Sequence, residues 1–454
     1  MIIISYGVFN LRNENIYEDV ISYYKCYNVR PLAFFTDAYV FSWFWDNMYA
    51  LLLIMLILHV LNLYLLYKIC EKIDIKLNAF CMILFAFAPL LIEALYWISA
   101  STRIVFSLFL CLASIYLLLN SFGETKTVRK LTMFFSAIIL NLLCVGYYEQ
   151  TIALNLFLFS FVMICLKKYR YIFIPITSTI WIGIWYIYFM INGRMQARGA
   201  LNLTGIVESV KVCIKMVIDK FEIAYNNFIN SLGFGTDIVL NSAISIILLA
   251  IISVTIVYIY WNNCTKDENK KNFRKVFLGG IIFISPILPF VILETNYIAM
   301  RNLYLPFLGV AILLEVLFDL VLKLIKNNRA HNIIKTTVCG FFMIIFVIAN
   351  VDGTSNYKKI NAIDFKAFNQ VLKNVDKSYF EEQKTISINY DIDELNKYKN
   401  LSNNMECTIE SDWASMGKIQ VLSESKEIGN VYINSKQEEA DYTFYFDKDL
   451  NLVK

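Results

Sequence analysis

Residues Met48–Tyr67 read MYALLLIMLILHVLNLYLLY and contain no Asp, Glu, Lys or Arg. A helix of about 20 apolar residues crosses the hydrocarbon core of a bilayer, so this stretch predicts a transmembrane helix. The whole chain of 454 residues has the same character, because 58% of it is hydrophobic and only 17% is charged, unlike a soluble domain. We predict an all-α polytopic membrane bundle of about ten transmembrane helices. The predicted spans are 48–67, 77–94, 103–120, 131–147, 150–166, 171–191, 238–260, 276–294, 303–322 and 336–351.

Basic residues are concentrated in every second predicted loop. The alternate short loops hold little more than Arg103 and Arg301. By the positive-inside rule the basic loops are cytoplasmic, so both termini are expected outside a cell (cytoplasmic) membrane. The basic loops contain Lys68, Lys72 and Lys76; Lys126, Arg129 and Lys130; Lys167, Lys168 and Arg170; Lys266, Lys270, Lys271, Arg274 and Lys275; and Lys323, Lys326, Arg329 and Lys335.

Three regions follow from this topology. Residues 1–46 are expected to form an amphipathic outer segment at the membrane interface. Residues 47–351 form the membrane domain, whose large outer loop 193–236 contains an amphipathic run at Ile206–Ile229. Residues 352–454 are expected to form a small extracytoplasmic α+β domain. It contains a helical stretch, Phe365–Val375, and four predicted strands, at 385–390, 418–422, 430–434 and 442–446.

The composition argues against several classes of function. The net charge is only +4, and no basic run resembles a nucleic-acid-binding surface. The chain has 2 His, and its 10 Cys form no CxxC pair, so neither a His-rich metal centre nor a structural zinc site is expected.

Polar residues gather at the predicted outer ends of the spans, where lipid penalises them unless they have partners or a function. Any one of them is more often a solvated or snorkelling interface residue than a catalyst. As a group they place carboxylates and arginines on one face, and an arginine fork suits phosphate oxygens while a carboxylate suits a general base. The group comprises Glu93 and Arg103 in PLLIEALYWISASTR (Pro89–Arg103), Glu149 in GYYEQ (Gly146–Gln150), Glu294 and Arg301 in ETNYIAMRNLYLP (Glu294–Pro306), Arg194 and Arg198 in NGRMQAR (Asn192–Arg198), and Glu14, Glu18, Asp19 and Arg30 in the N-terminal segment.

Other polar residues lie inside the predicted spans. His59 and Asn62 share one helix face, and we expect interhelical hydrogen bonds from both, because polar side chains link membrane helices. Asn141, Glu315 and Asp319 are interpreted in the same way.

Five motifs along residues 30–310 resemble integral-membrane glycosyltransferases of the GT-C superfamily. The similarity is strongest to the polyprenyl-phosphate-sugar-dependent, O-mannosyltransferase-like branch, whose members show RPL, HxxN, PxxxEAVxWIS, KEQ and RYLYLP in this order. The matching stretches are Arg30-Pro31-Leu32, His59-Val-Leu-Asn62, Phe87-Ala-Pro89 with Glu93-Ala-Leu-Tyr-Trp97-Ile98-Ser99, Tyr148-Glu149-Gln150, and Arg301-Asn-Leu-Tyr-Leu-Pro306.

The resemblance implies a reaction. A sugar would pass from a polyprenyl-phosphate donor to a cell-envelope glycan, lipid or protein hydroxyl on the outer face, in some members with a divalent metal (Mg²⁺ or Mn²⁺). A carboxylate would accept the proton of the acceptor, and arginines would hold the leaving phosphate. The implied catalytic candidates are Glu93, Glu149, Glu18 and Asp19. The implied substrate- and phosphate-binding candidates are Arg103, Arg301, Arg194, Arg198, Arg30, Trp97 and Tyr148.

The chain departs from the family in two places. The family's catalytic Asp, often in a DD pair, opens its first outer loop, and no DD precedes Arg30. Either Glu14, Glu18 or Asp19 replaces it, or the reading frame lacks its beginning, which Met1–Phe9 favours by its likeness to the tail of a helix. The family's acid after the WIS turn is replaced by Arg103 or its neighbours.

The sequence leaves alternatives open. A polymerase or ligase acting on lipid-linked polysaccharide would also need outer arginines, and an inactive GT-C-like homologue would keep the motifs without the reaction. A flippase-like carrier would instead place polar residues along a path at mid-membrane.

Overall fold

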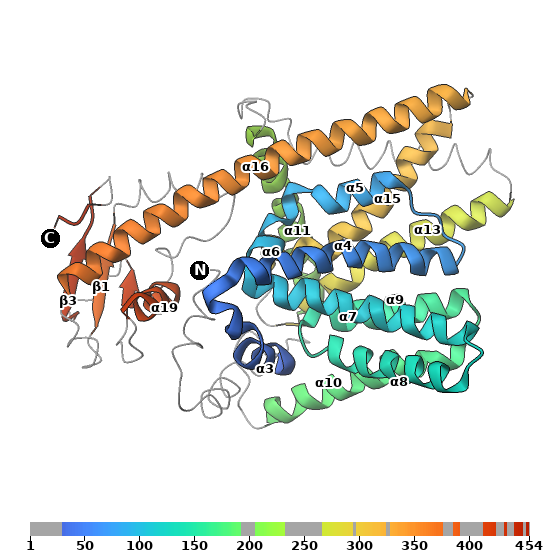
Figure 1. Cartoon of the computed structure of the whole chain (residues 1–454), viewed down its shortest axis with the longest axis horizontal. Helices are drawn as coiled ribbons and strands as arrows, with labels where there is room; N and C mark the ends of the chain where they lie inside the picture. Colours follow the sequence, from blue (N-terminus) through green and yellow to red (C-terminus); the bar gives the residue numbers. More distant parts are fainter. Residues whose placement is uncertain are drawn as a thin grey trace.

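The computed structural model describes residues 30–191, 205–231, 266–293, 297–323, 327–375, 385–390, 412–423, 431–433, 440–447 and 451–453. Within these residues the membrane part is all-α, and only the C-terminal part contains strands (Figure 1). The elements are α3 (Pro31–Tyr39), η1 (Phe41–Asn47), α4 (Met48–Lys72), α5 (Ala79–Phe87), η2 (Pro89–Leu91), α6 (Ile92–Tyr96), α7 (Ile98–Gly123), α8 (Thr127–Cys144), α9 (Glu149–Cys165), η3 (Tyr169–Ile172), α10 (Phe173–Ile191), α11 (Ile206–Ser231), α13 (Lys266–Ile284), η5 (Ser285–Ile287), α14 (Leu288–Ile292), η6 (Met300–Leu303), α15 (Tyr304–Lys323), α16 (Asn328–Asn374), β1 (Ile386–Asn389), α19 (Asp412–Ser423), β2 (Val431–Ile433) and β3 (Tyr442–Tyr445).

The chain is a multi-pass membrane protein. In the described residues, 7 helices are long and apolar enough to cross a membrane, or up to 8 if one bent pair counts as a single span. That pair is Ala79–Phe87 with Pro89–Tyr96, bent by 45°. The shorter apolar helix α9 lies where a span was predicted at 150–166, and the predicted span 238–260 lies outside the described residues. The seven helices are Met48–Lys72, Ala100–Gly123, Thr127–Cys144, Tyr169–Tyr188, Asn272–Ile292, Met300–Lys323 and Arg329–Asp352.

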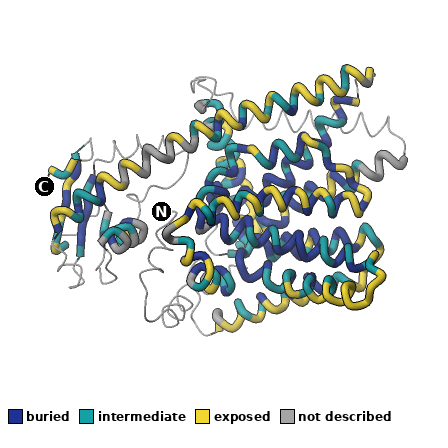
Figure 2. Tube along the Cα trace, in the orientation of Figure 1, coloured by how far each residue is buried: buried dark blue, intermediate teal, exposed yellow. Residues whose placement is uncertain are grey.

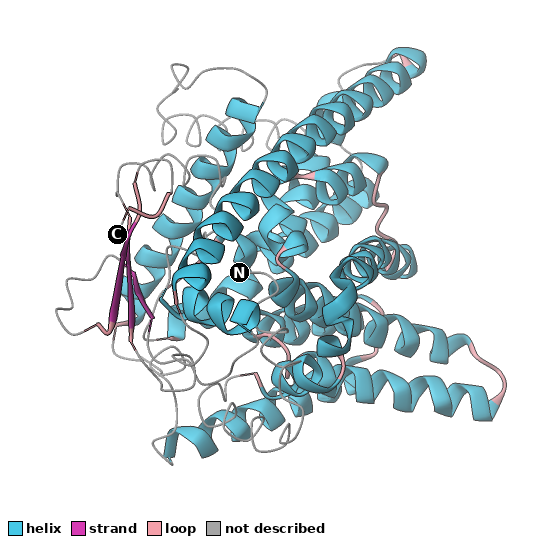
Figure 3. Ribbon diagram, turned by 60° about the vertical axis from the view of Figure 1, so that its left-hand side comes forward, coloured by secondary structure: helices cyan, strands magenta, loops and turns pink. Residues whose placement is uncertain are grey.

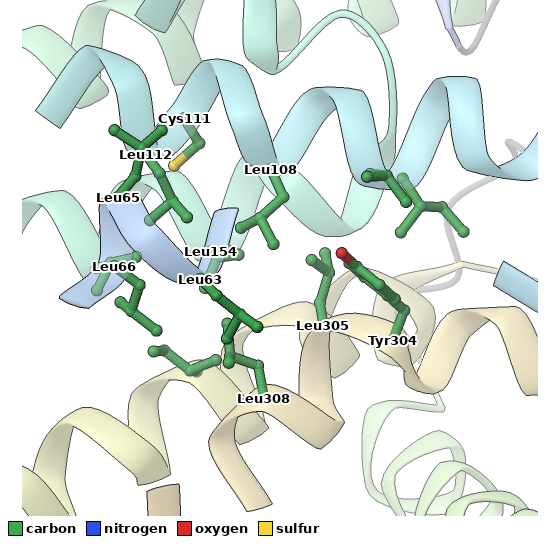
Figure 4. Packing of buried hydrophobic residues seen from close by; sticks show 14 of the residues in the cluster. Leu63, Leu65, Leu66, Leu108, Cys111, Leu112, Leu154, Tyr304, Leu305 and Leu308 are labelled. Carbon is green, nitrogen blue, oxygen red and sulfur yellow. The ribbon is translucent and has the colours of Figure 1, made fainter. Parts of the chain in front are cut away.

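Helix α7 lies at the centre of the bundle. Its apolar window is 72% buried, whereas the corresponding windows of α8 and α16 are only 17% buried. Figure 2 shows the same contrast between buried residues in the interior and exposed residues along the outer helices. Many of the exposed residues are large and apolar, as suits helices that face lipid. In the interior, Leu63 of α4, Leu108 of α7, Leu154 of α9 and Leu308 of α15 belong to one apolar cluster (Figure 4).

A buried amide network joins four of the helices. Asn141 of α8 and Asn155 of α9 donate to each other's side-chain oxygens at 2.8 and 3.0 Å. Asn141 also donates to Ser114 of α7 at 3.2 Å and accepts from Ser178 of α10 at 2.7 Å. Because these side chains are fully buried, their hydrogen bonds fix how the four helices pack.

Helix α16 leaves the bundle as one continuous helix and reaches the strands (Figures 1 and 3). Its 47 residues correspond to about 70 Å. The predicted domain boundary at residue 352 falls within it, as does the predicted helix Phe365–Val375 except for its last residue. Beyond it, β1 lies between β2 and β3 and pairs in parallel with both.

The strand predicted at 418–422 is wrong, because these residues belong to α19. Ser415 and Ile419 are fully buried and Leu422 is partly buried, a spacing of four and three residues that places them on one helix face. The chain order also favours a helix here, since α19 precedes β2, and parallel strands such as β1 and β2 are normally joined by a helical crossover.

The amphipathic run of the large loop forms α11. Its buried residues Cys213 and Val217 pack with Phe290, Val291 and Leu303 in a second apolar cluster. Helix α11 therefore packs against the same part of the bundle that carries η6.

Candidate active site

Three carboxylate–arginine pairs lie at one end of the bundle, which we call the arginine end. It is formed by α3, α6, the first turns of α7, the α8–α9 turn and η6. Each pair joins segments that are far apart in sequence. The pairs are Arg30–Glu149, Asp37–Arg103 and Glu93–Arg301.

Arg30 precedes Pro31, the first residue of α3, and faces the first residue of α9. Its Nε and Nη2 atoms donate to the two carboxylate oxygens of Glu149 at 2.7 and 2.6 Å, a bidentate pair. Its guanidinium also lies over the ring of Tyr148, 4.3 Å from the ring centroid. The helix N-terminus further favours the negative charge of Glu149.

Burial and neighbouring charges set the protonation states of Arg30 and Tyr148. Burial alone would lower the pKa of Arg30, but the adjacent carboxylate of Glu149 outweighs it and raises the pKa overall. Burial raises the pKa of Tyr148 above its ordinary value. Arg30 therefore stays charged and Tyr148 stays a neutral phenol at physiological pH.

Helix α3 is fixed to the bundle at a second point. Nη2 of Arg103, on α7, donates to Oδ2 of Asp37 at 2.8 Å, and the Asp37 side chain is only 1% exposed. The backbone N–H of Leu32 donates to the carbonyl of Gly146 at 3.1 Å. A Cβ on Gly146 would lie 2.7 Å from the Leu32 side chain, so this close approach requires glycine.

Glu93 lies on the bent span and binds Arg301 of η6 through two hydrogen bonds. One carboxylate oxygen accepts the backbone N–H of Arg301 at 3.0 Å, and the other accepts from Nη1 of the same residue. The guanidinium of Arg301 lies 4.4 Å from the ring centroid of Trp97. Because the span bends at Pro89, α6 is directed towards η6 rather than continuing the axis of α5.

Asn302 and Gln150 connect these pairs. Nδ2 of Asn302 donates to the hydroxyl of Tyr148, and Gln150 Nε2 donates to the carbonyls of Asn302 and Pro286 at 2.9 and 3.0 Å. The positive charges of Arg30 and Arg301 both act on Tyr148, and each opposes the rise in its pKa that burial causes. The arginine end is therefore one contiguous assembly.

The assembly offers guanidinium forks, carboxylates and two aromatic rings in one place. Arginine forks suit phosphate oxygens, and carboxylates can accept protons or hold a partner in position. Among the described residues no three His, Cys, Asp or Glu side chains come together as a metal site. No family model, curated protein or solved structure matches the chain. The chemistry of the arginine end is therefore inferred from the residues of this chain alone.

The structure brings together most of the site residues proposed from the sequence, but it changes their partners. Glu93 and Arg103 were grouped as one loop, yet each pairs with a residue from another segment. The residues brought to the arginine end are Arg30, Glu93, Trp97, Arg103, Tyr148, Glu149 and Arg301. Those outside the described residues are Glu14, Glu18, Asp19, Arg194, Arg198 and Glu294.

Three members of this assembly were not predicted from the sequence, namely Asp37, Gln150 and Asn302. Asp37 carried a usable signal, because it is an acid within the otherwise apolar stretch PLAFFTDAY of α3. Asn302 carried none, since a polar residue beside Arg301 is unremarkable at a helix start.

His59 and Asn62 make hydrogen bonds between helices. Nδ1 of His59 lies 2.8 Å from the hydroxyl of Tyr304, and its Nε2 lies 3.4 Å from the carbonyl of Ala86. Nδ2 of Asn62 donates to the carbonyl of Val105 at 3.1 Å. Both residues are buried and link α4 to its neighbours, so they support the bundle beneath the arginine end.

A second charged cluster joins α5, α13 and α15. Lys275 forms ion pairs with Glu315 and Asp319. Glu315 is fully buried and accepts the backbone N–H groups of Asn78 and Cys81 at 2.9 and 3.1 Å. The carboxylate therefore caps the N-terminus of α5, the first half of the bent span that carries Glu93.

Proposed function

We propose that the protein is a membrane glycosyltransferase that takes a sugar from a polyprenyl-phosphate-linked donor at the arginine end. The observation that carries the proposal is the convergence of Arg30, Arg103 and Arg301, each with a carboxylate, from three distant segments. A lipid-linked phosphate is a suitable ligand for guanidinium groups at one end of a membrane bundle. The family-like order of the sequence motifs supports the same substrate class.

The reaction is a displacement at the anomeric carbon of the sugar. The acceptor hydroxyl forms a bond to that carbon, the bond from the carbon to the phosphate oxygen breaks, and the phosphate leaves with the electron pair. A carboxylate takes the acceptor's proton. Glu149 suits this role better than Glu93, because its side chain is 14% exposed against 6% and Glu93 holds the backbone of η6.

The arginines stabilise the charge that develops on the leaving phosphate. Arg30 and Arg301 have side chains that are 23% and 20% exposed, so a ligand can reach part of each guanidinium. Tyr148 and Trp97 hold these guanidiniums by their ring faces, which fixes their orientation without using their remaining N–H donors.

The proposal includes the finer topology. It places the arginine end on the outer face of the cytoplasmic membrane, with about ten spans and a GT-C-like arrangement, as the distribution of basic loops and the motifs suggest. It also treats residues 352–454 as a small extracytoplasmic α+β domain. The acceptor is a cell-envelope glycan, lipid or protein hydroxyl.

A divalent metal does not fit the described part of the arginine end. Glu93, Glu149 and Asp37 are each engaged by an arginine, and they do not form a ligand group. The reaction is therefore assigned to protein side chains, and no step passes through a metal.

The decisive experiment is sugar transfer from a labelled polyprenyl-phosphate donor by the purified chain in liposomes. Wild type is expected to transfer the label to an envelope acceptor, and Glu149→Gln is expected to abolish transfer. Glu71→Gln serves as the matched control, because Glu71 forms an exposed pair with Lys68 away from the arginine end. Absence of transfer by the wild type across donors would refute the proposal.

One observation favours a second candidate, a non-catalytic GT-C-like membrane protein. All three arginines of the described assembly are already paired with carboxylates, as expected of purely structural ion pairs. In that case the wild type binds no polyprenyl phosphate, and Glu149→Gln lowers only the stability of the fold.

A further inference from the structure

Asn302 makes four hydrogen bonds, one of which runs from its backbone N–H to the carbonyl of Ala299 at 3.0 Å. Its Oδ1 accepts the N–H of Ala299 at 2.8 Å, which closes the first turn of η6. Its Nδ2 donates to the hydroxyl of Tyr148 at 2.5 Å, and its carbonyl accepts from Gln150 at 2.9 Å. The residue is 4% exposed, so these bonds are shielded from water and stronger than surface bonds.

These bonds join two parts of the arginine end. The Arg30 half consists of Arg30, Tyr148 and Glu149, held by α3 and the start of α9. The Arg301 half consists of Glu93, Trp97 and Arg301, held by α6 and η6. Within each half an arginine is fixed by a carboxylate and a ring.

The link between the halves is short. Asn302 is the chain neighbour of Arg301, and it bonds to Tyr148, whose ring supports Arg30. A change in the Tyr148 hydroxyl is therefore transmitted to the backbone that carries Arg301. Because the Asn302 side chain also caps η6, the direction of Arg301 depends on the same amide group.

We propose that Asn302 is a positioning residue that sets the Arg301 half against the Arg30 half, so that both guanidiniums act on one phosphate group. This inference rests on the proposed function for its ligand, but the geometry that it assigns to Asn302 can be measured without any ligand. Asn302 itself touches no reacting atom.

The separating variant is Tyr148→Phe. It removes the hydroxyl that Asn302 binds, while it keeps the ring beneath Arg30 and the cap of η6. Tyr147→Phe is the matched control, because Tyr147 is the buried neighbouring tyrosine and its ring packs edge-on against Phe106. Asn302→Ala removes the link and the cap together.

The first measurement is the binding of labelled farnesyl phosphate to the full chain in nanodiscs. The dissociation constant is measured for Arg30→Gln, for Arg301→Gln and for the double variant. The coupling between the two arginines is the factor by which the change in the double variant differs from the product of the two single changes. We expect a coupling of about fivefold in wild type and in Tyr147→Phe. In Tyr148→Phe we expect a smaller coupling, because only the bond from Gln150 to the Asn302 carbonyl still joins the two halves. Unchanged coupling in Tyr148→Phe overturns the inference, since a residue that serves only the fold would lower the melting temperature alone.

The second measurement needs no ligand and no arginine variant. In protein labelled with 5-fluorotryptophan, the ¹⁹F resonance of Trp97 is assigned with Trp97→Phe. Tyr148→Phe is expected to shift this resonance and Tyr147→Phe is not. If wild type fails to bind farnesyl phosphate, the proposed function is refuted, while the Trp97 resonance still decides whether Asn302 joins the two halves.

Discussion

The ion pair between Lys275 and Glu315 allows a quantitative test of the fold. The two side chains are 7% and 0% exposed, and the carboxylate also accepts two backbone N–H groups from the start of α5. We predict that Lys275→Met strongly destabilises the protein, because it leaves a carboxylate buried without its counter-charge.

The magnitude follows from what remains around Glu315. Breaking a buried pair by removing one partner costs about 3–5 kcal/mol. The two N–H bonds to α5 persist, so the lower end of this range, about 3 kcal/mol, is expected. In the double variant Lys275→Met/Glu315→Gln the fully buried carboxylate is replaced by an amide, whose oxygen still accepts from α5. Asp319 also loses Lys275, but its side chain is 28% exposed and keeps the N–H donors of the Asn78 amide. That variant is expected within about 1 kcal/mol of wild type.

The assay is reversible unfolding by SDS in mixed micelles, followed by circular dichroism. Lys68→Met is the control, because Lys68 pairs with Glu71 on the exposed surface at a spacing of three residues. Its unfolding midpoint should match that of wild type. Equal destabilisation in the single and the double variant would refute the reasoning, since the penalty would then not arise from an unpaired buried charge.

Three further changes test other contacts. Glu93→Gln keeps an acceptor for Arg301 but removes the charge, so the initial rate of sugar transfer should fall about thirtyfold, equivalent to about 2 kcal/mol. A fall that Arg301→Gln reproduces and the double variant does not exceed would show that the pair acts as a unit. Gly146→Val places a side chain against Leu32 and should destabilise by about 1–3 kcal/mol, measured by thermal unfolding on size-exclusion chromatography; an unchanged midpoint would show that α3 is not packed at this turn. Asn141→Leu leaves the amide network without its central member and should cost about 1–2 kcal/mol in the SDS assay, and a stabilised variant would contradict the network.

Hydropathy predicted each of the 7 candidate spans that the described residues show, because it reports a property of each helix alone. The stretch Met48–Tyr67 predicts α4 without reference to any partner. The packed bundle as a whole determines which helix ends lie next to each other. Two charged residues in the same loop therefore need not form an ion pair with each other. Glu93 and Arg103 are ten residues apart, yet the bend at Pro89 turns one towards η6 while the other faces α3.

The misses have similar physical causes. Asp37 was overlooked because a short helix such as α3 shows no span of its own, so its single acid carried little weight. The segment 418–422 alternates enough to suggest a strand, and tertiary packing against α16 and the sheet decided for a helix instead. Candidate residues such as Glu18 and Asp19 lie outside the described residues, so their role stays a prediction.

The balance of charge at the arginine end constrains how a phosphate can enter it. In the described assembly three arginines face three carboxylates, and an added anion in partly buried surroundings is costly unless it takes over an arginine from its carboxylate. Asp37 is the most buried of these acids and Glu149 the most exposed, so Arg30 is the arginine most readily shared. A Glu149 carboxylate released from Arg30 is a stronger proton acceptor than one held by a bidentate pair. In the proposed reaction, binding of the donor phosphate thus prepares the base that activates the acceptor, and the donor must bind before the acceptor can react.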